Sequence, residues 1–157
     1  MKSYAVVALF DPLEVGAVIN RRAWPAHVTL ASNFVTSAST SGIARAVYEA
    51  APVDAPMRVH VGEQALFGPN RDVRVRLVDS NQAVSVHNRL ADQLESLPGF
   101  VPEEPAYWRQ GYRPHLTLGP AAAAGEGDRE TSNCVVIVDI FDTDARILAA
   151  FNSRGAL

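Results

Sequence analysis

Two short segments of the chain share one pattern: Trp24-Pro-Ala-His27-Val-Thr-Leu30 and Tyr112-Arg-Pro-His115-Leu-Thr-Leu118. Each has an aromatic residue three positions before a histidine, a nearby proline, and then His-aliphatic-Thr-Leu. A little over half of the 157 residues separates the two histidines. Similar strand and helix signals surround both segments, as an internal duplication would leave them. The repeat therefore decides how the rest of the chain is interpreted.

Strand periodicity places the repeated side chains. Successive residues of a strand point to opposite faces, so His27 and Thr29 share one face and the aliphatic residues take the other. The same alternation applies to His115 and Thr117. The aliphatic pairs belong in a core. If the two segments pair as neighbouring strands, two histidines and two threonines line one groove.

Such a groove suits phosphoryl chemistry without a metal. A histidine can act near neutral pH as a base for water or as an acid for a leaving ribose oxygen. Threonine hydroxyls can donate to the non-bridging oxygens, where charge gathers in the transition state. Zinc needs three or four protein ligands, and neither motif has a third candidate nearby. Asp139, Asp142 and Asp144 are typical of a turn. We therefore expect no metal and no other cofactor.

The remaining segments predict an α+β fold. Apolar runs and period-2 alternation indicate strands at 4–10, 27–30, 57–61, 73–77 and 115–118, with a closing hairpin of 134–141 and 147–151. Helical spacing predicts helices over 43–50 and about 82–97, and the Ala/Gly-rich stretch 121–133 reads as an exposed loop or a frayed helix. No long linker divides the chain, so one domain covering residues 1–157 is expected.

Composition limits the partners and the compartment. With 14 basic and 17 acidic residues, the formal charge of −3 argues against clamping of long duplex nucleic acid. Cys134 is the only cysteine, which excludes an intrachain disulfide. The sequence has neither a signal peptide nor an apolar run of membrane-spanning length. These features favour a soluble cytoplasmic protein without membrane contact, and a monomer is the default expectation.

The two His-x-Thr motifs resemble those of the 2H phosphoesterase superfamily, which includes the bacterial 2'-5' RNA ligase-like proteins and cyclic nucleotide phosphodiesterases. The resemblance covers most of the chain. It implies an α+β, LigT-like fold of two duplicated strand-helix-strand lobes with pseudo-twofold symmetry, in which antiparallel sheets form a central cleft. The lobes would cover roughly residues 1–79 and 80–157. Family members often have a helix after the second motif, where this chain has the Ala/Gly-rich stretch 121–127.

The resemblance also implies a function. The expected enzyme is a metal-independent phosphodiesterase that cleaves 2',3'-cyclic phosphates, 2'-5' linkages or cyclic (di)nucleotides. His27 and His115 would be its acid–base pair, with Thr29 and Thr117 as phosphate binders. The residues do not assign base and acid; for hydrolysis, His115 is favoured as the base and His27 as the acid. Two alternatives stay open: a 2'-5' RNA ligase that uses the same groups in reverse, and a module that binds a nucleotide or RNA end without turnover.

Residues near the motifs are candidates for substrate binding. Arg113 lies two positions before His115 and shares its face if the strand extends that far. Four aromatic residues flank the motifs and could stack on a nucleobase: Trp24, Tyr107, Trp108 and Tyr112. The other two histidines read as structural. His60 is expected to be solvated, and His87 is expected at the surface or edge of its helix.

Overall fold

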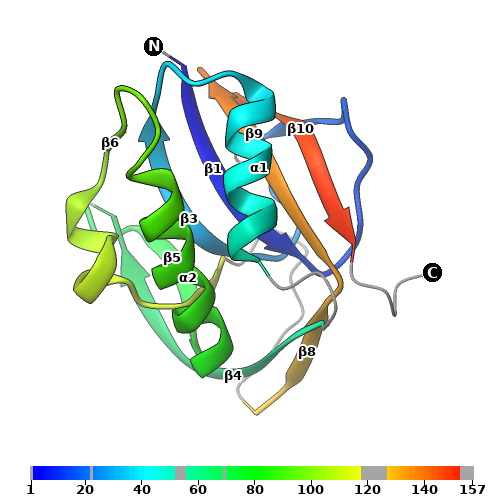
Figure 1. Cartoon of the computed structure of the whole chain (residues 1–157). Coiled ribbons are helices and arrows are strands. Elements are labelled where there is room, and N and C mark those ends of the chain that lie inside the picture. Colours follow the sequence, from blue (N-terminus) through cyan, green and yellow to red (C-terminus); the bar gives the residue numbers. More distant parts are fainter. Residues whose placement is uncertain (1, 22, 52–55, 69, 118–126, 153–157) are drawn as a thin grey trace.

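One antiparallel sheet and two helices make up the part of the chain that the structure describes (Figure 1). The structure is a computed structural model, and it describes residues 2–21, 23–51, 56–68, 70–117 and 127–152. The strands are β1 (Ser3–Leu9), β2 (Val18–Asn20), β3 (His27–Val35), β4 (Met57–Phe67), β5 (Val73–Asp79), β6 (Val101–Pro102), β7 (His115–Thr117), β8 (Arg129–Ser132), β9 (Cys134–Phe141) and β10 (Asp144–Asn152). The helices are α1 (Thr40–Ala50) and α2 (Asn81–Leu94), followed by the single 3₁₀ turns η1 (Pro105–Tyr107) and η2 (Arg109–Gly111).

The two helices begin at serine caps. The Ser39 hydroxyl accepts a hydrogen bond from the Gly42 amide, and the Ser80 hydroxyl accepts one from the Ala83 amide. Each bond satisfies an amide that has no partner within the helix. Both helices lie on the same side of the sheet in Figure 1. They turn their buried stripes toward it: Ile43, Ala46, Val47 and Ala50 from α1, and Ala83, Val86, His87, Leu90, Ala91 and Leu94 from α2.

Apolar side chains cover both faces of the sheet around β1. One cluster, which includes Val28, Leu30 and Leu116, lies between the sheet and the helices. A second cluster, which includes Val7, Leu9 and other residues of β1, β2, β9 and β10, packs on the opposite face. Because side chains alternate along a strand, β1 contributes to both clusters and is buried along almost its whole length.

The strand order places β3 and β7 next to each other in the middle of the sheet, as β2-β10-β9-β1-β3-β7-β5-β4-β8, with β6 paired to β3. The half of the sheet from β2 to β3 contains strands from both ends of the chain, because β9 and β10 lie there beside β1. The other side combines β7 and β8 with β4 and β5. The predicted lobe boundary near residue 79 therefore does not coincide with the middle of the sheet. Duplicated strand-helix-strand lobes and their pseudo-twofold axis stay predictions.

Several elements differ from the sequence-based expectation. Part of the stretch expected to be a loop or frayed helix forms β8, which pairs Ser132 with Met57 and Arg129 with His60 of β4. Residues 121–126 lie outside the described part of the chain. β3 continues to Val35 and β4 to Phe67, well beyond the strands predicted from alternation. The short strands β2 and β6 were not predicted, since two or three residues carry little periodicity.

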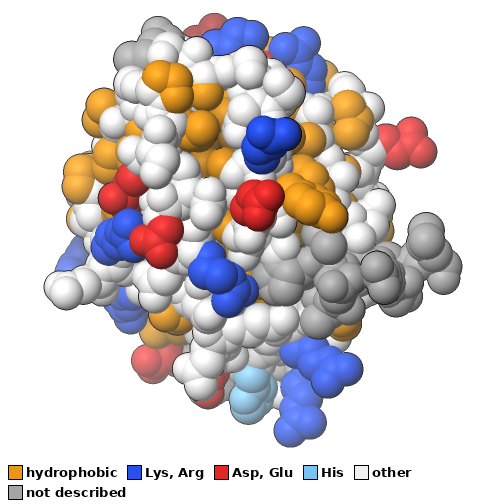
Figure 2. All heavy atoms as spheres, viewed as in Figure 1, with side chains coloured by type: hydrophobic (Ala, Val, Ile, Leu, Met, Phe, Trp, Pro, Cys, Tyr) orange, Lys and Arg blue, Asp and Glu red, His pale blue; other side chains and the backbone are white. Residues whose placement is uncertain are grey.

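The surface is mixed in charge where it can be seen. Acidic and basic side chains are interspersed over the face shown in Figure 2, with apolar side chains between them. None of the described helices is long and apolar enough to cross a membrane.

The turn that ends at Gly111 yields a prediction about stability. A Cβ atom at Gly111 would lie 1.9 Å from the Ala106 carbonyl oxygen, so the Gly111→Ala variant must displace the backbone just before the second motif. We expect a loss of about 1–3 kcal/mol in unfolding free energy, the range typical of overpacked sites. Urea denaturation measures it.

Gly42→Ala is the matched control. Its Cβ atom would meet only ordinary contacts, 3.4 Å from the Ser39 hydroxyl and 3.7 Å from the Ala38 Cβ. Alanine is favoured over glycine in a helix by about 0.5–1 kcal/mol, so this variant should be at least as stable as the parent. Equal stability of the two variants would contradict the close approach at Gly111.

Candidate active site

The two repeated motifs lie side by side on β3 and β7. These strands are antiparallel, with His27 opposite Thr117 and Val28 opposite Leu116. Extending this register by one residue brings Thr29 level with His115. Val28 and Leu116 are fully buried in the cluster beneath the helices. The two histidines and two threonines therefore share the opposite face, and each histidine neighbours the threonine of the other motif.

Both histidine rings are held in the same way. The Nδ1 atom of His27 lies 2.9 Å from the Pro25 carbonyl oxygen, and that of His115 lies 2.8 Å from the Arg113 carbonyl oxygen. A carbonyl oxygen can only accept, so Nδ1 carries the hydrogen in both rings. The neutral ring then leaves Nε2 as an unprotonated acceptor. The repeat in sequence is thus also a repeat in hydrogen bonding.

His27 lies deep in the structure. Its side chain is buried, and the Trp24 ring lies against it with 4.6 Å between ring centroids. Burial penalises the charged imidazolium and lowers the pKa of His27 to about 4. The bond to the Pro25 carbonyl opposes this shift, while the charge of His115 adds to it. The two rings are therefore close enough for their charges to repel.

His115 occupies a more open position. It is only partly buried, and the Phe67 ring packs on it with 4.4 Å between ring centroids. Burial lowers the pKa of His115 below its usual value; the bond to the Arg113 carbonyl opposes this shift, and the charge of the Arg113 side chain adds to it. Both motif histidines are consequently neutral at pH 7 in the free protein.

A pocket of about 480 Å³ opens beside His115 and Thr29. Its floor comes from β3, one wall from the β4–β5 hairpin, and the other wall from the loop that precedes the second motif. The lining residues are Thr29, Ser32, Asn33, Phe67, Gly68, Val73, Glu104, Pro105, Ala106, Tyr107, Tyr112, Arg113 and His115. The buried hydroxyl oxygen of Ser32 has no hydrogen-bond partner among the residues that the structure describes. The pocket thus combines aromatic and polar lining residues, and it adjoins Thr29 and His115 of the four motif residues.

Three of the predicted substrate-binding residues line this pocket. The Tyr107 ring stacks on the Phe67 ring with 5.5 Å between centroids and 14° between planes. The Arg113 guanidinium lies 5.5 Å from the centre of the same Phe67 ring. β7 begins only at His115, so Arg113 reaches the pocket from the preceding loop and not from the strand. Tyr112 lines the inner end and donates its hydroxyl hydrogen to the Thr29 carbonyl.

The two tryptophans do not line the pocket. Trp24 packs against His27 and the second apolar cluster. Trp108 is buried, and its indole nitrogen donates to a Glu95 carboxylate oxygen at 2.9 Å. Its ring packs among Phe100 and His87 beneath α2. This placement does not support the prediction that Trp108 stacks on a base, because the ring is buried and its indole nitrogen is engaged inside the protein.

His87 differs most from its prediction. It is completely buried, whereas the sequence interpretation placed it at the surface or edge of its helix. A signal was present: His87 follows Ala83 by four residues and precedes Leu90 by three, so it lies within the apolar stripe of α2. Phe67, Ser32, Asn33 and Glu104 were also missed as pocket residues, and no local pattern marks them. His60 is exposed, as expected.

The chemistry available at this site is acid–base chemistry and hydroxyl donation. Among the described residues, no three side chains of the His, Cys, Asp or Glu types gather closely enough to hold a metal ion. The site offers two neutral imidazoles with unprotonated Nε2 atoms, two threonine hydroxyls and one adjoining guanidinium. These groups are suited to binding an anionic ester and to transferring protons to and from it.

Known structures share this architecture. The crystal structure of TT0787 of Thermus thermophilus aligns over 100% of both chains, with a TM-score of 0.61 and 18% identity. E. coli LigT complexed with 3'-AMP aligns over 98% of both chains, with a TM-score of 0.54 and 14% identity. A crystal structure described as a phosphoesterase aligns over 97% of this chain and 98% of its own, with a TM-score of 0.57 and 12% identity. At these identities the likeness concerns the fold.

The sequence itself identifies the family. No curated protein matches the chain by sequence. However, the family model described as the 2'-5' RNA ligase superfamily matches residues 7–131. That range includes both His-x-Thr motifs, the pocket and both helices, and it confirms the family predicted from the motifs. The protein belongs to the 2'-5' RNA ligase superfamily.

Proposed function

We propose that the protein is a metal-independent phosphodiesterase that cleaves 2',3'-cyclic phosphate, 2'-5' or cyclic (di)nucleotide linkages. The observation that carries this proposal is the pairing of β3 with β7, which gathers His27, Thr29, His115 and Thr117 on one face. Membership of a superfamily with phosphoesterase-like folds supports it. The named LigT complexes contain 3'-AMP, ATP or NADP⁺, so that related fold accepts nucleotides.

In the proposed reaction the two histidines transfer different protons. One takes a proton from the attacking water as its oxygen bonds to phosphorus, and the other gives a proton to the ribose oxygen as the P–O bond breaks. The threonine hydroxyls donate to the non-bridging oxygens, where negative charge is concentrated. The pocket beside His115 takes the nucleoside, with Phe67 and Tyr107 providing aromatic surface and Arg113 a positive charge near the phosphate.

The difference in burial supports the opposite assignment of base and acid to the one favoured from the sequence. His27 is the more deeply buried ring and resists protonation most strongly, with its pKa lowered to about 4. The single proton that the proposed reaction needs is therefore placed on His115, the more exposed of the two rings. We accordingly assign His27 as the base and His115, at the mouth of the pocket, as the acid for hydrolysis.

Removing either imidazole tests the proposal directly. His27→Ala and His115→Ala should each lower kcat by about 10²–10⁴-fold, because each group assists one proton transfer. Turnover is measured by chromatography on a panel of 2',3'-cyclic nucleotides, cyclic dinucleotides and 2'-5' oligomers in the presence of EDTA. His60→Ala, at an exposed position of β4, is the control and should leave turnover unchanged. Full activity in both motif variants would refute the mechanism.

Two further measurements distinguish the two alternatives. Joined product from RNA halves with 2',3'-cyclic phosphate and 5'-hydroxyl ends would identify a ligase. Tight binding of nucleotides by calorimetry with no product from any substrate would identify a binding module.

The pKa shifts predict an acidic optimum. The active form carries one proton on the histidine pair, and both pKa values in the free protein lie below 6.5. That form is most abundant at a pH above about 4, the pKa of His27, and it loses its proton as the pH rises through the lowered pKa of His115. A plot of kcat/KM against pH should therefore peak below pH 6.5 and fall toward pH 8. A plateau that extends above pH 7.5 would contradict the buried, neutral pair.

A sulfur substitution tests which histidine is the acid. A thiolate leaves without needing a proton, so replacing the leaving oxygen of the substrate with sulfur removes the need for a general acid. His115→Ala should recover most of its lost rate on this analogue, while His27→Ala should stay slow. The ratio of variant to parent rates on the two substrates gives the answer. Recovery by His27→Ala instead would restore the assignment favoured from the sequence.

A further inference from the structure

The first His-x-Thr motif, residues 27–29 of β3, is called motif 1, and the second, residues 115–117 of β7, is called motif 2. Motif 1 is followed directly by a bulge in its strand. Val7 of β1 pairs with Thr29 and Val6 pairs with Ala31, so Leu30 is an extra residue without a partner on β1. On the other edge of β3, the ladder with β7 pairs only His27 and Val28 within the described part of the chain. The segment that carries the Thr29 hydroxyl is thus held by fewer strand hydrogen bonds than an ordinary central strand.

Two side chains replace the missing strand contacts. The Tyr112 hydroxyl donates to the Thr29 carbonyl at 2.8 Å, and the His87 Nδ1–H donates to the Leu30 carbonyl at 2.7 Å. The two rings stack almost parallel, with 4.1 Å between centroids and 3° between planes. Tyr112 lies three residues before His115 on the chain. Its hydroxyl therefore bonds the segment that leads into motif 2 directly to motif 1.

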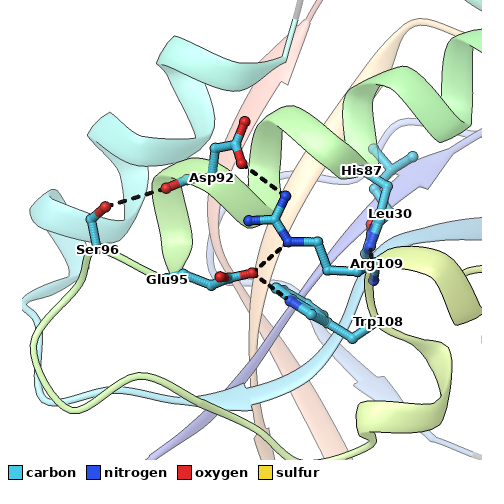
Figure 3. A network of polar contacts seen from close by, with 7 residues as sticks. All are labelled: Leu30, His87, Asp92, Glu95, Ser96, Trp108 and Arg109. Carbon is cyan, nitrogen blue, oxygen red and sulfur yellow. Dashed lines mark hydrogen bonds and ion pairs between the residues drawn. The ribbon is translucent and has the colours of Figure 1, made fainter.

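His87 is fixed on its other side as well. Its Nε2 atom accepts a hydrogen bond from the Arg109 amide at 2.9 Å, so both ring nitrogens are used and one neutral tautomer is defined. Figure 3 shows this ring between the Leu30 backbone and the Arg109 backbone. The imidazole thus connects the β3 bulge to the turn that precedes motif 2.

The turn at Arg109 is anchored to the end of α2. Its guanidinium donates to the Asp92 and Glu95 carboxylates, both at 2.8 Å, and Glu95 also accepts from the Trp108 indole (Figure 3). Arg109 has a left-handed backbone, with a φ of 59°. These contacts hold the turn against the helix and present the Arg109 amide to His87.

We propose that His87 and Tyr112 are a pair of positioning residues that align Thr29 of motif 1 with His115 of motif 2. This inference rests on the proposed phosphodiesterase function. Neither nitrogen of His87 is free for chemistry, and the ring is completely buried. Its role is to hold the Tyr112 ring in place, so that the hydroxyl of Tyr112 fixes the backbone carrying the Thr29 side chain.

The sharpest variant is Tyr112→Phe, which removes one hydroxyl and keeps the ring stacked on His87. We expect kcat to fall about tenfold on the best substrate of the panel while KM changes less than about twofold, since misplacing a reacting group slows chemistry more than binding. His87→Leu removes both hydrogen bonds of the ring and should lower kcat further. His87→Gln keeps a donor and an acceptor and should recover part of that loss.

Leu90→Ala is the control for a purely structural effect. Leu90 lies on the same buried stripe of α2 and is also completely buried, but it contacts neither motif through a hydrogen bond. Its kcat per folded molecule should stay within twofold of the parent, even though its melting temperature falls at least as far as that of Tyr112→Phe. If kcat follows melting temperature across the four variants, His87 and Tyr112 only stabilise the fold and the proposal is overturned.

A second measurement does not require turnover. NMR titration gives the pKa of His27 and His115 in the parent and in Tyr112→Phe. If the pair aligns the motifs, the pKa of at least one motif histidine should shift by half a unit or more in Tyr112→Phe but not in Leu90→Ala. Unchanged values in both would overturn the proposal. An inactive parent in which the titration still shifts would count against the phosphodiesterase function alone.

Discussion

The antiparallel contact between β3 and β7 is the constraint on which the site depends. Because side chains alternate on both strands, the same register that buries Val28 and Leu116 beneath the helices sends the His and Thr side chains to the opposite face. A slip of either strand by one residue would turn its His and Thr side chains toward the core. The burial of two aliphatic residues therefore also fixes the geometry of the catalytic candidates.

Burial shapes the chemistry of these groups as well as their position. The ring of His27 packs against Trp24, and the ring of His115 packs against Phe67 in the lining of the pocket. Both rings give their Nδ1 hydrogen to a carbonyl two residues earlier, which orients Nε2 without a carboxylate partner. The free protein therefore keeps the pair neutral at pH 7. An anionic ester bound between the two rings would favour the protonated form that the proposed reaction requires.

The support for the site extends beyond the strands. The bulge at Leu30 leaves backbone groups of β3 without strand partners, and α2 and the loop before β7 supply them through His87, Tyr112 and the turn at Arg109. Helix α2 therefore covers the sheet and also supplies hydrogen bonds to the site. It connects the two motifs by a second route that does not pass through the short β3–β7 ladder.

The sequence by itself determined the family, the strand identity of both motifs, the two helices and the His/Thr faces, because these follow from local periodicity and from a repeated pattern. It did not determine which strands are neighbours, that β8 forms at Arg129–Ser132, or that Trp108 is engaged in the interior. The sequence placed His87 at the surface or edge of its helix, although its spacing to Ala83 and Leu90 puts it in the apolar stripe. Its complete burial and its hydrogen bonds to the backbone of Leu30 and Arg109 became evident only in the structure. Those features depend on residues distant in sequence, such as Glu95 beside Trp108 or Phe67 beside His115. Only the folded chain brings such residues into contact, since hydrogen bonding and desolvation act over a few ångströms in space.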